Sequence, residues 1–168
     1  MKIETDRLII RSFDQSDIED YAAIVSDPQV TRYLNSSDPH SSEEASEYVN
    51  WVIEEESKTG IVRYAVTLKE SGKLIGFCGF KRIGDNVDFG WRYGYAYWGN
   101  GYGSEAAKAV FDYGNKVLKL ENVFCVAMVE NVASVKIIQK LGFKDHVYGE
   151  ARGKRTVKYF NHGENGGT

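Results

Sequence analysis

The apolar residues of this chain follow two spacings, one typical of helices and one typical of strands, and together they predict a mixed order of elements. Ile18, Tyr21, Ala22 and Val25, for example, recur at helical spacing. This spacing predicts helices over residues 18–26 with a short continuation at 28–34, then 42–58, 105–119 and 131–141. Short apolar or alternating runs predict strands over residues 3–13, 62–69, 74–83, 87–93, 123–129, 143–148 and 156–160.

The connections between these elements indicate how the strands pair. Ser71-Gly72 and Gly84-Asp85-Asn86 are tight-turn sequences, so they predict an antiparallel meander. Strand 87–93, helix 105–119 and strand 123–129 form a crossover unit, which should be parallel and right-handed. We therefore expect an α+β (mixed α/β) fold, with a mostly antiparallel twisted sheet of about seven strands flanked by about four helices.

Length, composition and charge limit the functional classes. Residues 1–168 are enough for a single domain, which we expect to end in a flexible polar tail over residues 161–168. A net charge of −3 is unlike that of a typical nucleic-acid-binding protein. No window approaches the ~20 apolar residues of a membrane span, and the N-terminus carries no apolar signal segment, so we expect a cytoplasmic protein without membrane contacts. Cys78 and Cys125 fall in apolar strands, which predicts buried free thiols, and no residue spacing indicates a metal site.

The junction between strand 87–93 and helix 105–119 has the sequence Tyr-Trp-Gly-Asn-Gly-Tyr-Gly-Ser-Glu at residues 97–105. Its glycines leave backbone N–H groups uncovered next to the positive end of a helix, an arrangement that binds phosphate. A Walker loop is excluded because the segment has no lysine. Gly99–Ser104 comes close to the dinucleotide fingerprint, with Glu130 as the candidate ribose ligand, but the chain lacks a doubly wound pattern. A dinucleotide-binding oxidoreductase and a helix-entry loop without a ligand therefore stay open as alternatives.

Four segments resemble the motifs of one family, in the same order along the chain. Residues 5–11 resemble T-x-R-L-x-L-R, and residues 27–34 resemble D-P-x-V-x-x-Y-L. Residues 89–105 contain Phe-Gly-Trp and then the glycine loop, similar to I-G-Y followed by Y-W-G-x-G-Y-A-T-E. Residues 131–143 contain Asn-Val-Ala-Ser and Lys-Leu-Gly-Phe, similar to N-x-A-S and K-L-G-F. The sequence thus resembles the GNAT superfamily of acetyl-CoA-dependent N-acetyltransferases, and within it the branch of the ribosomal-protein N-terminal alanine and serine acetyltransferases.

The resemblance implies how acetyl-CoA binds. The sheet should splay between its fourth strand, 87–93, and its fifth, 123–129, so that the pantetheine arm pairs with exposed strand backbone. The backbone amide of Tyr93 or of a neighbour would polarise the acetyl carbonyl. Lys108, Lys136 and Lys140 are candidates for contact with the 3′-phosphate. The implied cofactor-binding residues are Trp91, Tyr93, Trp98, Gly99, Asn100, Gly101, Tyr102, Gly103, Ser104, Asn131 and Ser134.

The resemblance also implies catalytic roles. Ser134 would protonate the leaving thiolate and Asn131 would bond the pantetheine amides, although a helix N-cap for Asn131 and a solvated hydroxyl for Ser134 are equally open. Glu150 is our candidate for the general base that deprotonates the amine. His146, Asp88 and a carboxylate acting through an ordered water are alternatives.

The acceptor follows less directly from the sequence. The amine could belong to a ribosomal or other protein N-terminus, a polyamine, an amino acid or a drug-like molecule. Six glutamates in helix 42–58 are either a solvated surface or a means of attracting a basic acceptor. Neither cysteine occupies a motif position, so we expect direct attack in a ternary complex rather than an acetyl-enzyme. A non-catalytic acetyl-CoA-sensing domain is a further alternative, and the chain could be a monomer or a homodimer.

Overall fold

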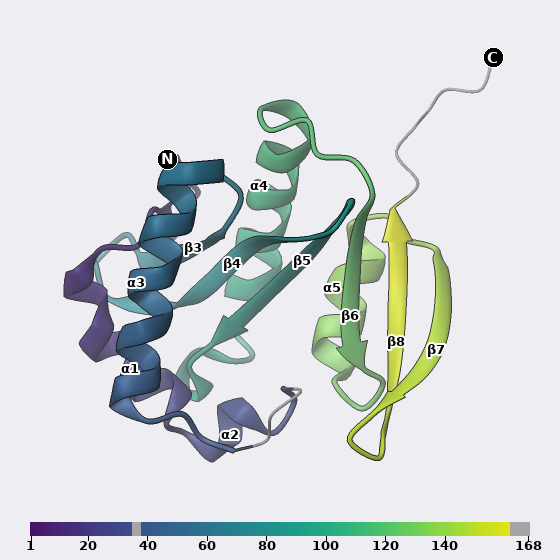
Figure 1. The fold of residues 1–168 in the computed structure, drawn as a ribbon, viewed down its shortest axis with the longest axis horizontal. Helices are drawn as coiled ribbons and strands as arrows, with labels where there is room; N and C mark the ends of the chain where they lie inside the picture. The colour runs from purple at the N-terminus through teal and green to yellow at the C-terminus, as the bar shows by residue number, and fades with distance from the viewer. Residues whose placement is uncertain (35–37, 162–168) are drawn as a thin grey trace.

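The computed structural model describes residues 1–34 and 38–161, which contain an eight-stranded sheet with helices on both faces (Figure 1). The strands are β1 (Lys2–Glu4), β2 (Leu8–Arg11), β3 (Arg63–Leu68), β4 (Leu74–Ile83), β5 (Asn86–Tyr93), β6 (Val123–Met128), β7 (Asp145–Ala151) and β8 (Lys154–Asn161). Their order across the sheet is β1-β2-β3-β4-β5-β6-β8-β7. All neighbouring pairs are antiparallel except β5–β6, which is parallel. The expected mixed α/β fold with a mostly antiparallel sheet is confirmed.

The two ends of the sheet differ in detail from the pattern prediction. The first predicted strand, 3–13, is a hairpin of β1 and β2, because the Thr5 N–H donates to the Leu8 carbonyl (3.0 Å) and closes a turn. The described residues therefore hold eight strands where the pattern predicted about seven. At the other end, β7 and β8 extend to a two-residue turn in which Arg152 and Gly153 have φ of 51° and 75°. Two successive left-handed residues suit a tight hairpin, because their twist matches that of the strands.

Two predictions concern residues outside the described part of the chain. Residues 35–37 belong to the polar connection predicted before the third helix, and residues 162–168 make up most of the predicted flexible tail. Asn161, the first residue of that predicted tail, instead ends β8, where it pairs with Val123 of β6.

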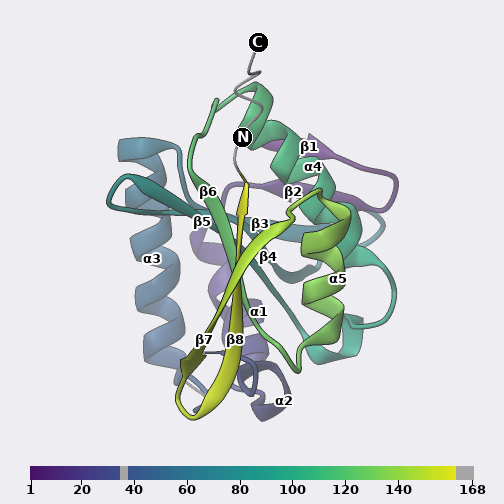
Figure 2. The same cartoon turned by 90° about the vertical axis from the view of Figure 1, so that its right-hand side faces the viewer.

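Helices cover the sheet in two layers (Figure 2). The layer on one face holds α1 (Ile18–Val25) and α3 (Ser42–Thr59), and the layer on the other holds α4 (Tyr102–Lys116) and α5 (Val132–Lys140). We call these the α1/α3 face and the α4/α5 face. A short helix, α2 (Pro28–Thr31), follows α1. Local sequence sets the helix starts: at α3, the Ser41 hydroxyl accepts from the Glu44 N–H while the Glu44 carboxylate accepts from the Ser41 N–H, both at 3.1 Å.

Aromatic rings fill both interfaces between sheet and helices. On the α4/α5 face, Phe89 of β5 packs against Phe111 of α4 with ring centroids 5.6 Å apart. On the α1/α3 face, Phe77 of β4 lies 6.2 Å from Tyr21 of α1 and 5.9 Å from Tyr48 of α3. The central strands β4 and β5 are therefore packed between the two helix layers. Strand β5 also forms one wall of the site described below.

The closest helix–sheet approach gives a stability prediction. A Cβ atom added at Gly114 of α4 would lie 2.4 Å from Cζ of Phe80, a buried ring that also stacks on Phe89. We expect Gly114→Ala to lower the free energy of unfolding by about 1–2 kcal/mol, because overpacking outweighs the better helix propensity of alanine.

The matched control is Asn115→Ala, at the neighbouring exposed position, which should change stability by less than about 0.5 kcal/mol. Chemical denaturation measures both variants. Equal stabilities would contradict the tight packing of α4 on β4.

Candidate active site

The sheet opens between β5 and β6. The two strands pair only through Val87↔Val123 and Asp88↔Phe124 within the described residues, and then they diverge (Figure 1). The Val87 N–H points toward β6, since it donates to the carbonyl of Asn122 (3.1 Å). Residues two apart along a strand point the same way, so the N–H groups of Phe89, Trp91 and Tyr93 face the opening. An extended, amide-containing chain could pair with this edge as an added strand does.

A cleft of about 710 Å³ occupies the opening and reaches both faces of the sheet. Its α4/α5 side is lined by the glycine loop, the start of α4 and one face of α5. Its α1/α3 side is lined by α2 and by charged and aromatic side chains of β3, β4 and β5. All the predicted cofactor-binding residues line it except Asn100, whose side chain instead donates to the carbonyls of Tyr97 (3.2 Å) and Trp98 (3.1 Å).

The glycine loop presents uncovered N–H groups at the start of α4. Gly99 and Gly101 have φ of 77° and 81°, a left-handed conformation that favours glycine. The N–H of Glu105 makes the first bond of the helix, to the Gly101 carbonyl (3.1 Å), so the N–H groups of Tyr102, Gly103 and Ser104 have no partner within it. These donors lie at the positive end of the helix dipole, which favours an anion there.

Gly103 has a packing role as well. A Cβ atom at this position would lie 3.2 Å from Cδ1 of Ile137 and 3.3 Å from Cε2 of Tyr93. A larger side chain would therefore push apart the floor of the cleft, where α4, α5 and β5 meet. The Tyr93 ring is thus already adjacent to the loop.

Thr5 and Arg7, in the turn of the N-terminal hairpin, hold the glycine loop through hydrogen bonds that we call the clamp. Arg7 donates from Nε to the Glu105 carboxylate (2.8 Å) and from Nη1 to the carbonyl of Asn100 (2.8 Å), and its guanidinium lies 4.4 Å from the Tyr102 ring centre. Thr5 donates its hydroxyl to the same carboxylate (2.6 Å). The motif segment 5–11 contains both residues, but the sequence alone gave them no role because their partner Glu105 lies 98 residues beyond Arg7.

The hydrogen bonds of the clamp favour the ionised form of the Glu105 carboxyl. Partial burial opposes ionisation, but the hydrogen bonds from Thr5 and Arg7 outweigh it and lower the pKa of the Glu105 carboxyl below its usual value. A lowered pKa means that the clamp is intact at neutral pH and is lost only as the pH falls through that value.

Trp91, Asn131 and Ser134 come together where α5 meets β5. The indole N–H of Trp91 donates to the Ser134 hydroxyl oxygen (3.2 Å). The Asn131 side chain caps α5 by accepting from the Ser134 N–H (3.3 Å), so the N-cap interpretation of Asn131 is confirmed. Because the Ser134 oxygen already accepts a hydrogen bond, its own proton is available to donate into the cleft.

Trp98 serves the structure of the loop through its side chain. Its indole N–H donates to the Tyr93 carbonyl (2.9 Å), and its ring stacks on Tyr33 with centroids 6.1 Å apart. Any phosphate contact of this residue is therefore left to its backbone.

The base candidates are separated by the sheet. His146 contacts the Tyr159 ring (5.0 Å between centroids), and Tyr159 accepts from Gln139 of α5, so His146 lies on the α4/α5 face. Glu150 is four residues further along β7 and points to the same face, where it is exposed and does not line the cleft. The structure therefore does not bring Glu150 to the site. Asp88 does line the cleft, on the α1/α3 side, with its carboxylate 2.7 Å from Nη2 of Arg63.

Comparison with known proteins now decides the family. Residues 7–144 match the family model of the acetyltransferase (GNAT) domain. The chain belongs to the GNAT acetyltransferase family.

Individual relatives of this GNAT protein agree. The uncharacterised N-acetyltransferase YoaA of Bacillus subtilis is 31% identical over 146 residues, which cover 84% of this chain and 82% of YoaA. A GNAT-family acetyltransferase from Bacillus anthracis has a crystal structure with a TM-score of 0.81 and 27% identity, covering 96% of this chain and 98% of that one. RimL, a ribosomal α-N-protein acetyltransferase, has a structure in complex with coenzyme A that shares the fold, with a TM-score of 0.82 and 16% identity over 96% of this chain and 98% of RimL.

Two further observations concern only residues 1–34 and 38–161. None of their helices combines the length and apolar character that a membrane span requires. No group of three or more His, Cys, Asp or Glu side chains in these ranges is arranged to hold a metal ion.

The clamp on the glycine loop gives a prediction for this GNAT protein. Arg7→Ala should raise the Kd for acetyl-CoA about tenfold, because the loop loses the charge-assisted bonds that fix its amides in place. Isothermal titration calorimetry measures the Kd. The control is Arg82→Ala, an exposed arginine of β4 outside the cleft lining, which should bind normally. Equal affinity in both variants would rule out a role of the clamp in acetyl-CoA binding.

Proposed function

We propose that the chain is a single-domain, acetyl-CoA-dependent N-acetyltransferase that moves the acetyl group to a primary amine by direct attack in a ternary complex. The observation that carries this proposal is the opened β5–β6 pair beside the glycine loop, which offers strand amides and helix N-terminal amides to one ligand. Acetyl-CoA has both groups that such a site would bind, an amide-containing arm and a diphosphate.

The diphosphate would bind the loop amides from Gly101 to Ser104, with Lys136 and Lys140 of α5 lining the same side of the cleft. Lys108, the third candidate for the 3′-phosphate, does not line it. The arm would extend from there along β5. Because the Tyr93 ring is already adjacent to the loop, the far end of the arm should pass beyond Tyr93. We therefore assign the Tyr93 amide to the arm and the Trp91 or Phe89 amide to the acetyl carbonyl, where the developing negative charge needs a donor.

Ser134 would protonate the thiolate as it leaves. The Trp91 indole N–H supports this role, because a donor on the hydroxyl oxygen stabilises the negative charge that grows as the proton departs. Asn131 keeps its amide donors for the arm, since its oxygen is the atom used in the helix cap.

Asp88 takes the place that the sequence suggested for Glu150. It is the acidic residue among the described residues that line the cleft, and it lies on the face opposite α4 and α5. We propose that it accepts the proton of the incoming amine, directly or through an ordered water.

The acceptor is an amine that enters from the α1/α3 side. The RimL structure is named for an acetyltransferase of a ribosomal protein, so a ribosomal or other protein N-terminus is one candidate. The glutamates of α3 do not line the cleft, so they give no support to a polyamine at the site itself.

A thermal-shift assay tests the cofactor. Acetyl-CoA should raise the Tm and NADH should not, because the loop and the split strands fit one ligand together. Stabilisation by NADH alone would favour the oxidoreductase alternative. Free-thiol release with a panel of amines then separates an enzyme from an acetyl-CoA sensor, which would bind tightly and turn over no amine.

The proposed acid is tested by two variants of one hydrogen bond. Ser134→Ala should lower kcat by about tenfold to a hundredfold and change KM for acetyl-CoA less, because the proton is needed only as the thiolate leaves. Trp91→Phe keeps a ring and removes the N–H, so it should lower kcat by a smaller factor. Unchanged kcat in Ser134→Ala would remove the assignment, whatever the result for Trp91.

A further inference from the structure

One arginine on the acceptor side of the cleft has a charge without an acidic partner among the described residues. The Nη1 group of Arg92 donates to the Tyr21 hydroxyl (3.0 Å), and its Nε is buried with no hydrogen-bond partner in the described part of the chain. The Arg92 side chain is half-buried, and its guanidinium is a cation that can donate further hydrogen bonds.

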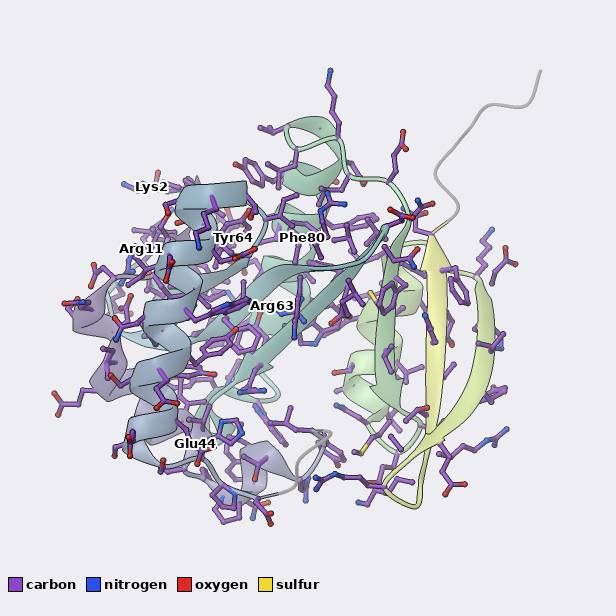
Figure 3. The ribbon with its side chains drawn as sticks, viewed as in Figure 1. Lys2, Arg11, Glu44, Arg63, Tyr64 and Phe80 are labelled. Atoms are coloured by element: carbon purple, nitrogen blue, oxygen red, sulfur yellow. The ribbon has the colours of Figure 1, made fainter. Side chains whose placement is uncertain are left out.

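The surroundings of Arg92 form a small aromatic and basic subsite. Arg92 and Phe77 are paired residues of β5 and β4, and the guanidinium carbon lies 5.0 Å from the Phe77 ring centre. The guanidinium carbon of Arg63 lies 6.0 Å from the same ring centre, and the Arg63 side chain lies over the middle of the sheet (Figure 3). Tyr21 of α1 and Tyr48 of α3 pack on the same Phe77 ring and support it from the helix side.

The charged side chains of β3 and β5 that line the cleft among the described residues are Arg63, Asp88 and Arg92, two cations and one anion. Asp88 is the acid among the cleft-lining residues, and it is already bound by Arg63 (2.7 Å). Arg63 also donates from Nη1 to the carbonyls of Gly79 (2.8 Å) and Asp88 (2.7 Å), so its charge is paired with Asp88 and its Nη1 donors are used. Of the two arginines among the described residues that line this side of the cleft, Arg92 is therefore the one without a carboxylate partner.

We propose that the acceptor amine carries a carboxylate, and that this carboxylate binds the Arg92 guanidinium, which lines the cleft. This inference rests on the proposed function. A planar guanidinium fork matches a carboxylate, and desolvation on the Phe77 ring strengthens the pair.

The position of Arg92 connects this subsite to the chemistry. Arg92 stands between Trp91 and Tyr93, whose amides face the opening, while its own side chain lies on the α1/α3 face. A molecule held by its carboxylate at Arg92 therefore has its amine near the opened strand edge. The acceptors that fit are amino acids and acidic peptides, rather than diamines or other purely cationic amines.

Matched amine pairs test this selectivity. The first two pairs are lysine with cadaverine and phenylalanine with phenethylamine. The third pair is two C-terminally amidated dipeptides that differ only in having Asp or Asn as the second residue. The carboxylate-bearing member should have a kcat/KM about tenfold higher, mainly through KM, in at least one pair. Arg92→Met should abolish that preference, Arg92→Lys should restore part of it, and Arg82→Met should keep it.

The outcomes separate the two proposals. Turnover that favours the amine without a carboxylate in every pair, or a preference that survives Arg92→Met, overturns this inference and leaves the acetyltransferase standing. Absence of turnover with every amine overturns both.

A second measurement uses the unaltered protein, because replacement of a half-buried arginine could disturb folding. N-acetylphenylalanine resembles the product that keeps a carboxylate, and N-acetylphenethylamine is its counterpart without one. In the presence of coenzyme A, the first should raise the Tm more than the second at equal concentration. Equal shifts would contradict a carboxylate subsite at Arg92.

Discussion

The structure depends on the loss of pairing between β5 and β6 after two residue pairs. Backbone N–H groups are costly to leave unpaired away from water, so an opened strand edge is a position where a ligand gains main-chain bonds. Val87 and Asp88 keep the strands together at one end, and the glycine loop and the start of α4 line the opening at the other. The cleft, the loop and the two faces of the site all follow from this opening.

Support for the site comes from far along the chain. The Arg7–Glu105 clamp ties the β1–β2 hairpin to the first turn of α4, and the Trp91–Ser134 bond ties β5 to α5. Each contact joins a strand region to a helix N-terminus, where the groups proposed to react or to bind phosphate lie. Alternate side chains of β5 lie on the two faces of the sheet, so under the proposed function one set faces the cofactor and the other faces the acceptor.

Much of this could be predicted from the sequence, because the relevant signals are local. The glycine loop, the N-cap at Asn131 and the crossover from β5 to β6 each show in a short segment. What could not be predicted depends on strand register and distant partners. Glu150 was the candidate base, but alternation along β7 turns it to the α4/α5 face, and nothing in the sequence shows that Arg92 lacks a carboxylate partner within the described residues.

The most direct measurement is a crystal structure of the chain with coenzyme A. The account predicts the diphosphate on the amides of residues 101–104 and the pantetheine arm against β5, between β5 and β6. A diphosphate bound elsewhere, with β5 and β6 unliganded, would contradict it.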